Sequence, residues 1–246
     1  MPYDSGAMPA TSAPSKTPVA PTRGALRPLS TDEIRLTGGF WAERQRINAT
    51  GIIPHADAWE TKVGWIDNFR AAVDGDILTT RTGREFADSD VYKLLEAMAW
   101  EFGREGDPAL DQRIREVAAL IGAVQEDDGY LHTLYGRPGQ APRYSDLEWG
   151  HELYCYGHLI QAAVARLRTG VHDELVEIAL RAADHVCREF GQEGRIAVCG
   201  HPEIEPALVE LYRATGERRY LDQARLFVDR RGHQTLLDIE FSRAYF

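Results

Sequence analysis

Three short phrases of the sequence gather residue types that can bind a sugar. They are FADSD at residues 86–90, EWGHE at residues 148–152 and GHPEIE at residues 200–205. Carboxylates and imidazoles exchange hydrogen bonds with hydroxyl groups, and aromatic rings cover the apolar faces of a sugar ring. His151 and His201 hold equivalent places in two of the phrases, which favours a binding role for both.

The same phrases have a purely structural interpretation. Asp88 and Ser89 can cap a helix, and Glu152 can be a first-turn acid that the helix dipole stabilises. For Asp88 and Ser89 the two interpretations carry equal weight.

A metal-ligand spacing is also present but incomplete. His151, Cys155 and His158 lie at i, i+4 and i+7, so one helical face would carry all three. No fourth ligand lies nearby in the sequence, and buried Cys and His side chains are common without a metal. We therefore expect no metal site here.

The elements that must position these phrases are helices, because apolar residues recur at spacings of three and four. The best strand candidate, residues 195–199, is short. The pattern predicts an all-α fold with helices over residues 91–102, 110–124, 147–167, 175–190, 202–211 and 220–228.

Tight connections at residues 105–106, 169–170 and 215–216 pair these helices into three antiparallel hairpins. In a ring of hairpins, the N-terminal ends of the first helices would converge on one mouth, and the three phrases stand there. A closed (α/α)6-type toroid needs about twice as many hairpins, so we expect an incomplete toroid. Its exposed apolar faces predict a missing C-terminal half or a homo-oligomer.

Composition limits the remaining choices. Lys plus Arg number 28 and Asp plus Glu number 38, a formal net charge of −10. This sign disfavours nucleic acids and anionic membranes as partners. No apolar run is long enough to span a bilayer, the first residues lack a secretory signal, and only three cysteines occur, so we expect a cytoplasmic protein. Residues 1–28 are rich in Pro, Ala, Ser and Thr and are expected to be a disordered tail before one domain over residues 29–246.

Taken together, the phrases resemble glycoside hydrolase family 127, the β-L-arabinofuranosidase-type enzymes. The resemblance rests on five phrases in the family's order, with shorter matches at residues 220–221 and 229–232, and it covers about residues 36–246. The five are GFWAERQ at 39–45, DSDVYK at 88–93, QEDDGYL at 125–131, HELYCYGH at 151–158 and GHPEIE at 200–205.

The resemblance implies the N-terminal part of an (α/α)6 catalytic domain that cleaves terminal β-L-arabinofuranosides with retention, in arabinose-containing oligosaccharides or glycoconjugates. It implies substrate-binding roles for His151 and His201 and places Asp90 near the sugar. The family's zinc ligands, cysteine nucleophile and glutamate acid/base lie further along the chain than residue 246. No catalytic residue or metal ligand is therefore assigned here, and this chain alone is expected to be inactive.

Two other functions stay open. A sugar epimerase or an unsaturated-uronide hydrolase would use the same kind of toroid without a cysteine-bound zinc. A non-catalytic helical-repeat interaction protein would need no closed ring.

Overall fold

The structure is a computed structural model that describes residues 17–19, 26–233 and 236. Most of the tail predicted over residues 1–28 lies outside the described residues. The helical elements are α1 (Gly39–Ile47), the π-helical η1 (Asn48–Ile52), α2 (Ile53–Lys62), α3 (Asp67–Asp74), α4 (Ile77–Thr80), α5 (Ala87–Glu105), α6 (Pro108–Val124), α7 (Glu152–Arg168), α8 (Glu174–Glu189), α9 (Ile204–Thr215) and α10 (Arg218–Arg230).

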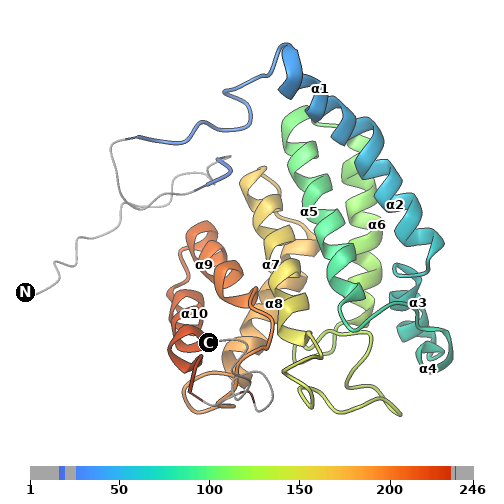
Figure 1. Cartoon of the computed structure of the whole chain (residues 1–246), viewed down its shortest axis with the longest axis vertical. Coiled ribbons are helices and arrows are strands. Elements are labelled where there is room, and N and C mark those ends of the chain that lie inside the picture. The colour runs from blue at the N-terminus through green and yellow to red at the C-terminus, as the bar shows by residue number, and fades with distance from the viewer. Residues whose placement is uncertain (1–16, 20–25, 234–235, 237–246) are drawn as a thin grey trace, which may run out of the picture.

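The helices form two layers. α5, α7 and α9 lie side by side in one layer, and α6, α8 and α10 pack behind them (Figure 1). The pairs α5/α6, α7/α8 and α9/α10 are the three predicted hairpins. The prediction of an all-α fold is confirmed.

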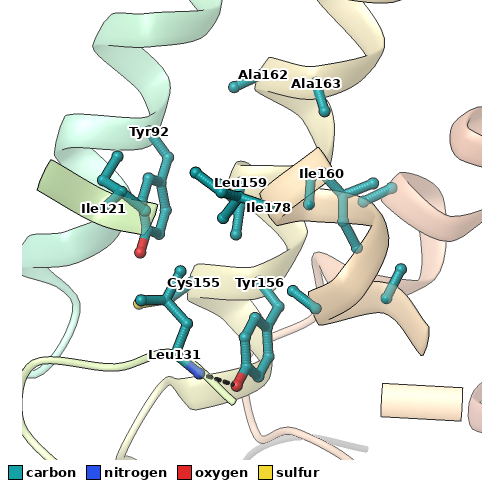
Figure 2. Packing of buried hydrophobic residues seen from close by; sticks show 14 of the residues in the cluster. Tyr92, Ile121, Leu131, Cys155, Tyr156, Leu159, Ile160, Ala162, Ala163 and Ile178 are labelled. Carbon is teal, nitrogen blue, oxygen red and sulfur yellow. Dashed lines mark hydrogen bonds between the residues drawn. The ribbon is translucent and has the colours of Figure 1, made fainter. Parts of the chain in front are cut away.

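The core centres on α7, which contacts α5, α8 and α9. Its residues Leu159, Ile160, Ala162 and Ala163 are fully buried, and Figure 2 shows them packed among side chains of the neighbouring helices. The small alanines let the layers approach closely.

Three features differ from the expectation. The third predicted helix begins at Glu152 rather than at residue 147, because residues 146–150 close a turn in which the Gly150 amide donates to the Asp146 carbonyl over 3.0 Å. Residues 195–199 form no strand. The first helices were not predicted, and α1 buries none of its residues, so it carries no apolar stripe.

A search of the described residues for a helix long and apolar enough to cross a membrane found none.

Candidate functional site

The two candidate histidines lie against each other. His151 is the N-cap of α7, and His201 lies just before α9. Their ring centroids are 5.3 Å apart, and the Phe86 ring lies 5.4 Å from that of His151. Burial, followed by the neighbouring His151 imidazole and the positive charge of Lys93, lowers the pKa of His201. At neutral pH its uncharged ring can therefore both donate and accept hydrogen bonds.

Tyr154 connects the histidines with α5. Its ring centroid lies 4.8 Å from that of His201, and Lys93 Nζ lies 5.1 Å from the centre of the Tyr154 ring. Lys93 in turn forms a 3.2 Å ion pair with Asp90. Asp90 thus reaches the histidines through Lys93 and Tyr154. Sequence reasoning missed these two connecting residues, although each lies three positions after a candidate residue, on the same helical face.

A carboxyl–imidazole pair extends the site along α7. His158 Nδ1 lies 3.7 Å from Glu203 Oε1, and the His158 ring centroid lies 4.6 Å from that of Tyr154. Burial, reinforced by the positive charge of Lys93, lowers the pKa of His158 to about 4. Burial and the charge of Glu96 raise the pKa of Glu203. Both shifts favour uncharged forms, which suits a neutral ligand better than an ionic one.

The capping interpretation of Asp88 and Ser89 is wrong. The helix α5 begins at Ala87, and its N-cap is Phe86, two residues before Asp88. Asp88 is buried, and its carboxylate accepts hydrogen bonds from the Thr133 amide at 2.8 Å and the Thr133 hydroxyl at 2.6 Å. Ser89 Oγ donates back to the Phe86 carbonyl. Asp88 therefore holds the loop that contains Thr133, and Ser89 holds the start of α5. Neither side chain caps a free amide of the helix.

The cysteines and the proposed metal spacing carry no site in the described part of the chain. Burial raises the pKa of Cys155 well above its usual value, that of Cys187 to about 12 and that of Cys199 to about 11, so these thiols stay protonated. Within the described residues, no group of three or more His, Cys, Asp and Glu side chains is arranged to hold a metal ion.

Among the cavities lined by described residues, a small pocket adjoins the site, and two larger ones lie away from it. The pocket, of about 350 Å³, lies between α2 and α5 and is lined in part by Glu60, Asp90 and Lys93. The cavities, of about 700 and 850 Å³, lie beside α1 and the C-terminal end of α5 and include none of the histidines. The residue types therefore favour the histidine cluster, rather than either of the two larger cavities, as the functional site.

Comparisons with known proteins identify the family of the chain. The family model described as the β-L-arabinofuranosidase, GH127 catalytic domain matches residues 33–243. A non-reducing end β-L-arabinofuranosidase of Bifidobacterium longum subsp. longum is 34% identical over 226 residues, which are 81% of this chain and 34% of that protein.

Solved structures give the same picture. A GH127 β-L-arabinofuranosidase from Geobacillus stearothermophilus T6 is 37% identical, with a TM-score of 0.75 over 81% of this chain and 33% of that one. A second GH127 β-arabinofuranosidase is 32% identical, with a TM-score of 0.78 over 87% of this chain and 35% of that one. The chain therefore spans about a third of the length of these relatives.

Proposed function

Because the chain belongs to the GH127 β-L-arabinofuranosidase family, we propose that its histidine cluster binds the non-reducing terminal β-L-arabinofuranosyl group of an oligosaccharide or glycoconjugate. The observation that carries this proposal is the contact between His151 and His201, two residues from separate hairpins whose rings lie 5.3 Å apart.

The surrounding residues suit a small neutral sugar. The two imidazoles can donate to and accept from ring hydroxyls, and the Phe86 and Tyr154 rings offer apolar faces beside them. Asp90, held by Lys93, supplies a carboxylate acceptor at the edge of the cluster. Trp149, which is 52% exposed, stands two residues before His151 and can cover a further sugar face.

Hydrolysis requires groups beyond those of this cluster. Retaining glycosidases use a nucleophile and an acid/base on opposite sides of the scissile bond. The three thiols of the chain are held protonated by burial, so none is an activated nucleophile. We therefore infer that this chain supplies the sugar-binding part of a retaining glycosidase and that, alone, it releases no arabinose.

Calorimetric titration with methyl β-L-arabinofuranoside tests the proposal. We expect the wild-type chain to bind this sugar and His151→Ala and His201→Ala to weaken binding about tenfold or more, since each removes hydrogen bonds to the ligand. His172→Ala is the matched control, because His172 is exposed and pairs with Glu177 on α8.

Each outcome bears on a specific claim. Absence of binding to the wild type, or equal binding by His201→Ala, would overturn the sugar-binding proposal. Release of arabinose by the 246-residue chain would overturn the inference that it is inactive alone. Tighter binding of an unsaturated uronide than of the arabinofuranoside would favour the alternative hydrolase class.

A further inference from the structure

Two non-glycine residues of the described chain have a left-handed backbone, and both adjoin the same carboxylate. They are Tyr144, with φ of 58°, and His151, with φ of 62°. Large side chains rarely adopt this conformation, because Cβ then crowds the following carbonyl oxygen. Strained residues of this kind persist only where their surroundings hold them. Glu152 directly follows His151 and binds the amide of Tyr144.

Glu152 uses both carboxylate oxygens. Its Oε1 accepts a hydrogen bond from the Tyr130 hydroxyl over 2.5 Å, and its Oε2 accepts from the Tyr144 amide over 2.7 Å. The side chain is fully buried. Both donors belong to residues 125–151, which join α6 to α7 and are named the anchoring loop here. The first residue of α7 thus fastens two distant points of the loop that leads into it.

The surroundings of this carboxylate are rigid. The Tyr144 hydroxyl lies 2.8 Å from His185 Nε2 on α8, and the Tyr130 ring packs edge-on against the Tyr144 ring. The Arg143 side chain lies over the Tyr130 ring, with its guanidinium carbon 4.0 Å from the centroid of that ring. A turn of the His151 backbone toward an ordinary conformation would rotate the loop against α7. Such a rotation would separate Glu152 from both of its donors.

We propose that Glu152 is a positioning residue, whose two hydrogen bonds fix the anchoring loop on α7 and thereby hold the His151 ring opposite His201. The carboxylate itself does not face the ligand, because it is buried on the side of α7 that packs against Tyr130 and Tyr144. Its effect on ligand binding passes through the backbone of His151, so this proposal rests on the sugar-binding role proposed above for His151.

Two variants separate this role from general stabilisation. Glu152→Ala removes both acceptors. Glu152→Gln keeps a carbonyl oxygen for the Tyr144 amide, and its NH₂ group can donate to the Tyr130 hydroxyl. Tyr130→Phe removes one of the two bonds and gives a milder test should Glu152→Ala fail to fold.

Tyr220→Phe is the matched control. Tyr220 is fully buried, and its hydroxyl donates to Asp184 Oδ1 over 3.0 Å, so it ties α10 to α8 outside the anchoring loop. Removing this hydroxyl should lower the melting temperature without moving the His151 ring.

The readouts are the NMR signal of the His151 ring, assigned with His151→Ala, and the affinity for methyl β-L-arabinofuranoside. We expect Glu152→Ala to shift the ring signal and to weaken binding about tenfold. Tyr130→Phe should shift the signal less, Glu152→Gln should stay within about threefold of wild-type affinity, and Tyr220→Phe should change neither readout.

An unchanged His151 signal in Glu152→Ala and Tyr130→Phe, or the same signal shift in Tyr220→Phe, would overturn the positioning role. The ring signal is recorded without ligand. If the wild type binds no sugar, the proposed function fails while the ring signal still decides whether Glu152 positions His151.

Discussion

Both ends of the hairpin layers have left-handed backbone positions, and at one end large residues occupy some of them. At the end where hairpins turn tightly, α5 and α9 stop at Gly106 and Gly216, with φ of 73° and 80°. At the opposite end, which carries the histidine cluster, Tyr144 and His151 adopt left-handed angles despite their large side chains. Glycine makes such a conformation without strain, and the anchoring loop uses it at Gly129, Gly136 and Gly139, so the large residues at positions 144 and 151 indicate that side chains are needed at these two positions.

Buried charges differ between the ends as well. At the turn end, the buried Arg166 guanidinium forms ion pairs with two carboxylates, that of Asp173 at 2.6 Å and that of Asp111. At the cluster end, Glu60 is buried near the carboxylates of Asp57 and Asp90, and its Oε2 has no hydrogen-bond partner. The buried charges of the turn end are therefore paired, although Arg166 Nη1 and Asp173 Oδ1 also lack hydrogen-bond partners, whereas the Glu60 carboxyl lies among like charges.

The largest effect is expected from breaking the charge arrangement of the turn end. Arg166→Met leaves the Asp173 carboxylate buried without its cation, which should cost about 3–5 kcal/mol of unfolding free energy. Sugar affinity of the folded fraction should not change, because Arg166 lies at the far end of α7 from His151. Urea unfolding measures the loss, with Arg213→Met, at a half-exposed pair with Glu210, as the control. A loss of unfolding free energy in Arg166→Met no larger than that in Arg213→Met would contradict the stabilising role of the Arg166 ion pairs.

A pH effect is expected at the cluster end. Burial, with the charges of Asp90 and Asp57, raises the pKa of Glu60 to about 7. Since the folded-state pKa lies above the ordinary value, protonated Glu60 stabilises the fold below about pH 4.5, and this contribution is lost as pH rises through about 7. The loss amounts to at most about 3 kcal/mol.

Glu60→Gln should remove this share of the pH dependence, measured by urea unfolding at about pH 5 and about pH 8. Burial also raises the pKa of Glu152 to about 7, so a slope of the same sign remains in the variant. Glu193→Gln, at an exposed turn position, is the control. An unchanged slope in Glu60→Gln would mean that the Glu60 carboxyl is solvated.

The smallest effects on stability are expected from exchanging residue types at left-handed backbone positions of the two ends. Gly216→Ala should destabilise by about 1–2 kcal/mol from conformation alone, since no heavy atom lies within 4 Å of the added Cβ. His151→Gly should leave the unfolding free energy within about 1 kcal/mol of wild type, because relief of strain offsets the greater freedom of glycine when unfolded. It should nevertheless abolish most sugar binding. A loss of stability in His151→Gly larger than in Gly216→Ala would contradict the contrast between the two ends.

The sequence predicted the helical layers well because burial leaves a periodic trace. The stripe from Val91 to Phe102 lies within α5, and that from Leu110 to Val124 lies within α6. α1 has no buried residue and left no such trace. The start of α7 was misplaced because a turn at residues 146–150, which also carries apolar side chains, continued the helical pattern.

The site was predictable only where its residues repeat between hairpins. His151 and His201 stood out for that reason, and the structure brings their rings together. The role of Asp88 could not be recognised, because its partner Thr133 lies 45 residues away and local spacing carries no information about such a contact. The binding roles of His151, His201 and Asp90 remain predictions until a ligand is titrated.

The most direct test of a single sugar site at the cluster end is an NMR titration of the chain with methyl β-L-arabinofuranoside, following the ring signals of His151, His201 and His172. We predict that the first two signals move together and saturate at the same sugar concentration, while that of His172 stays fixed. Signals of His151 and His201 that do not move, or that saturate at different concentrations, would contradict one shared site.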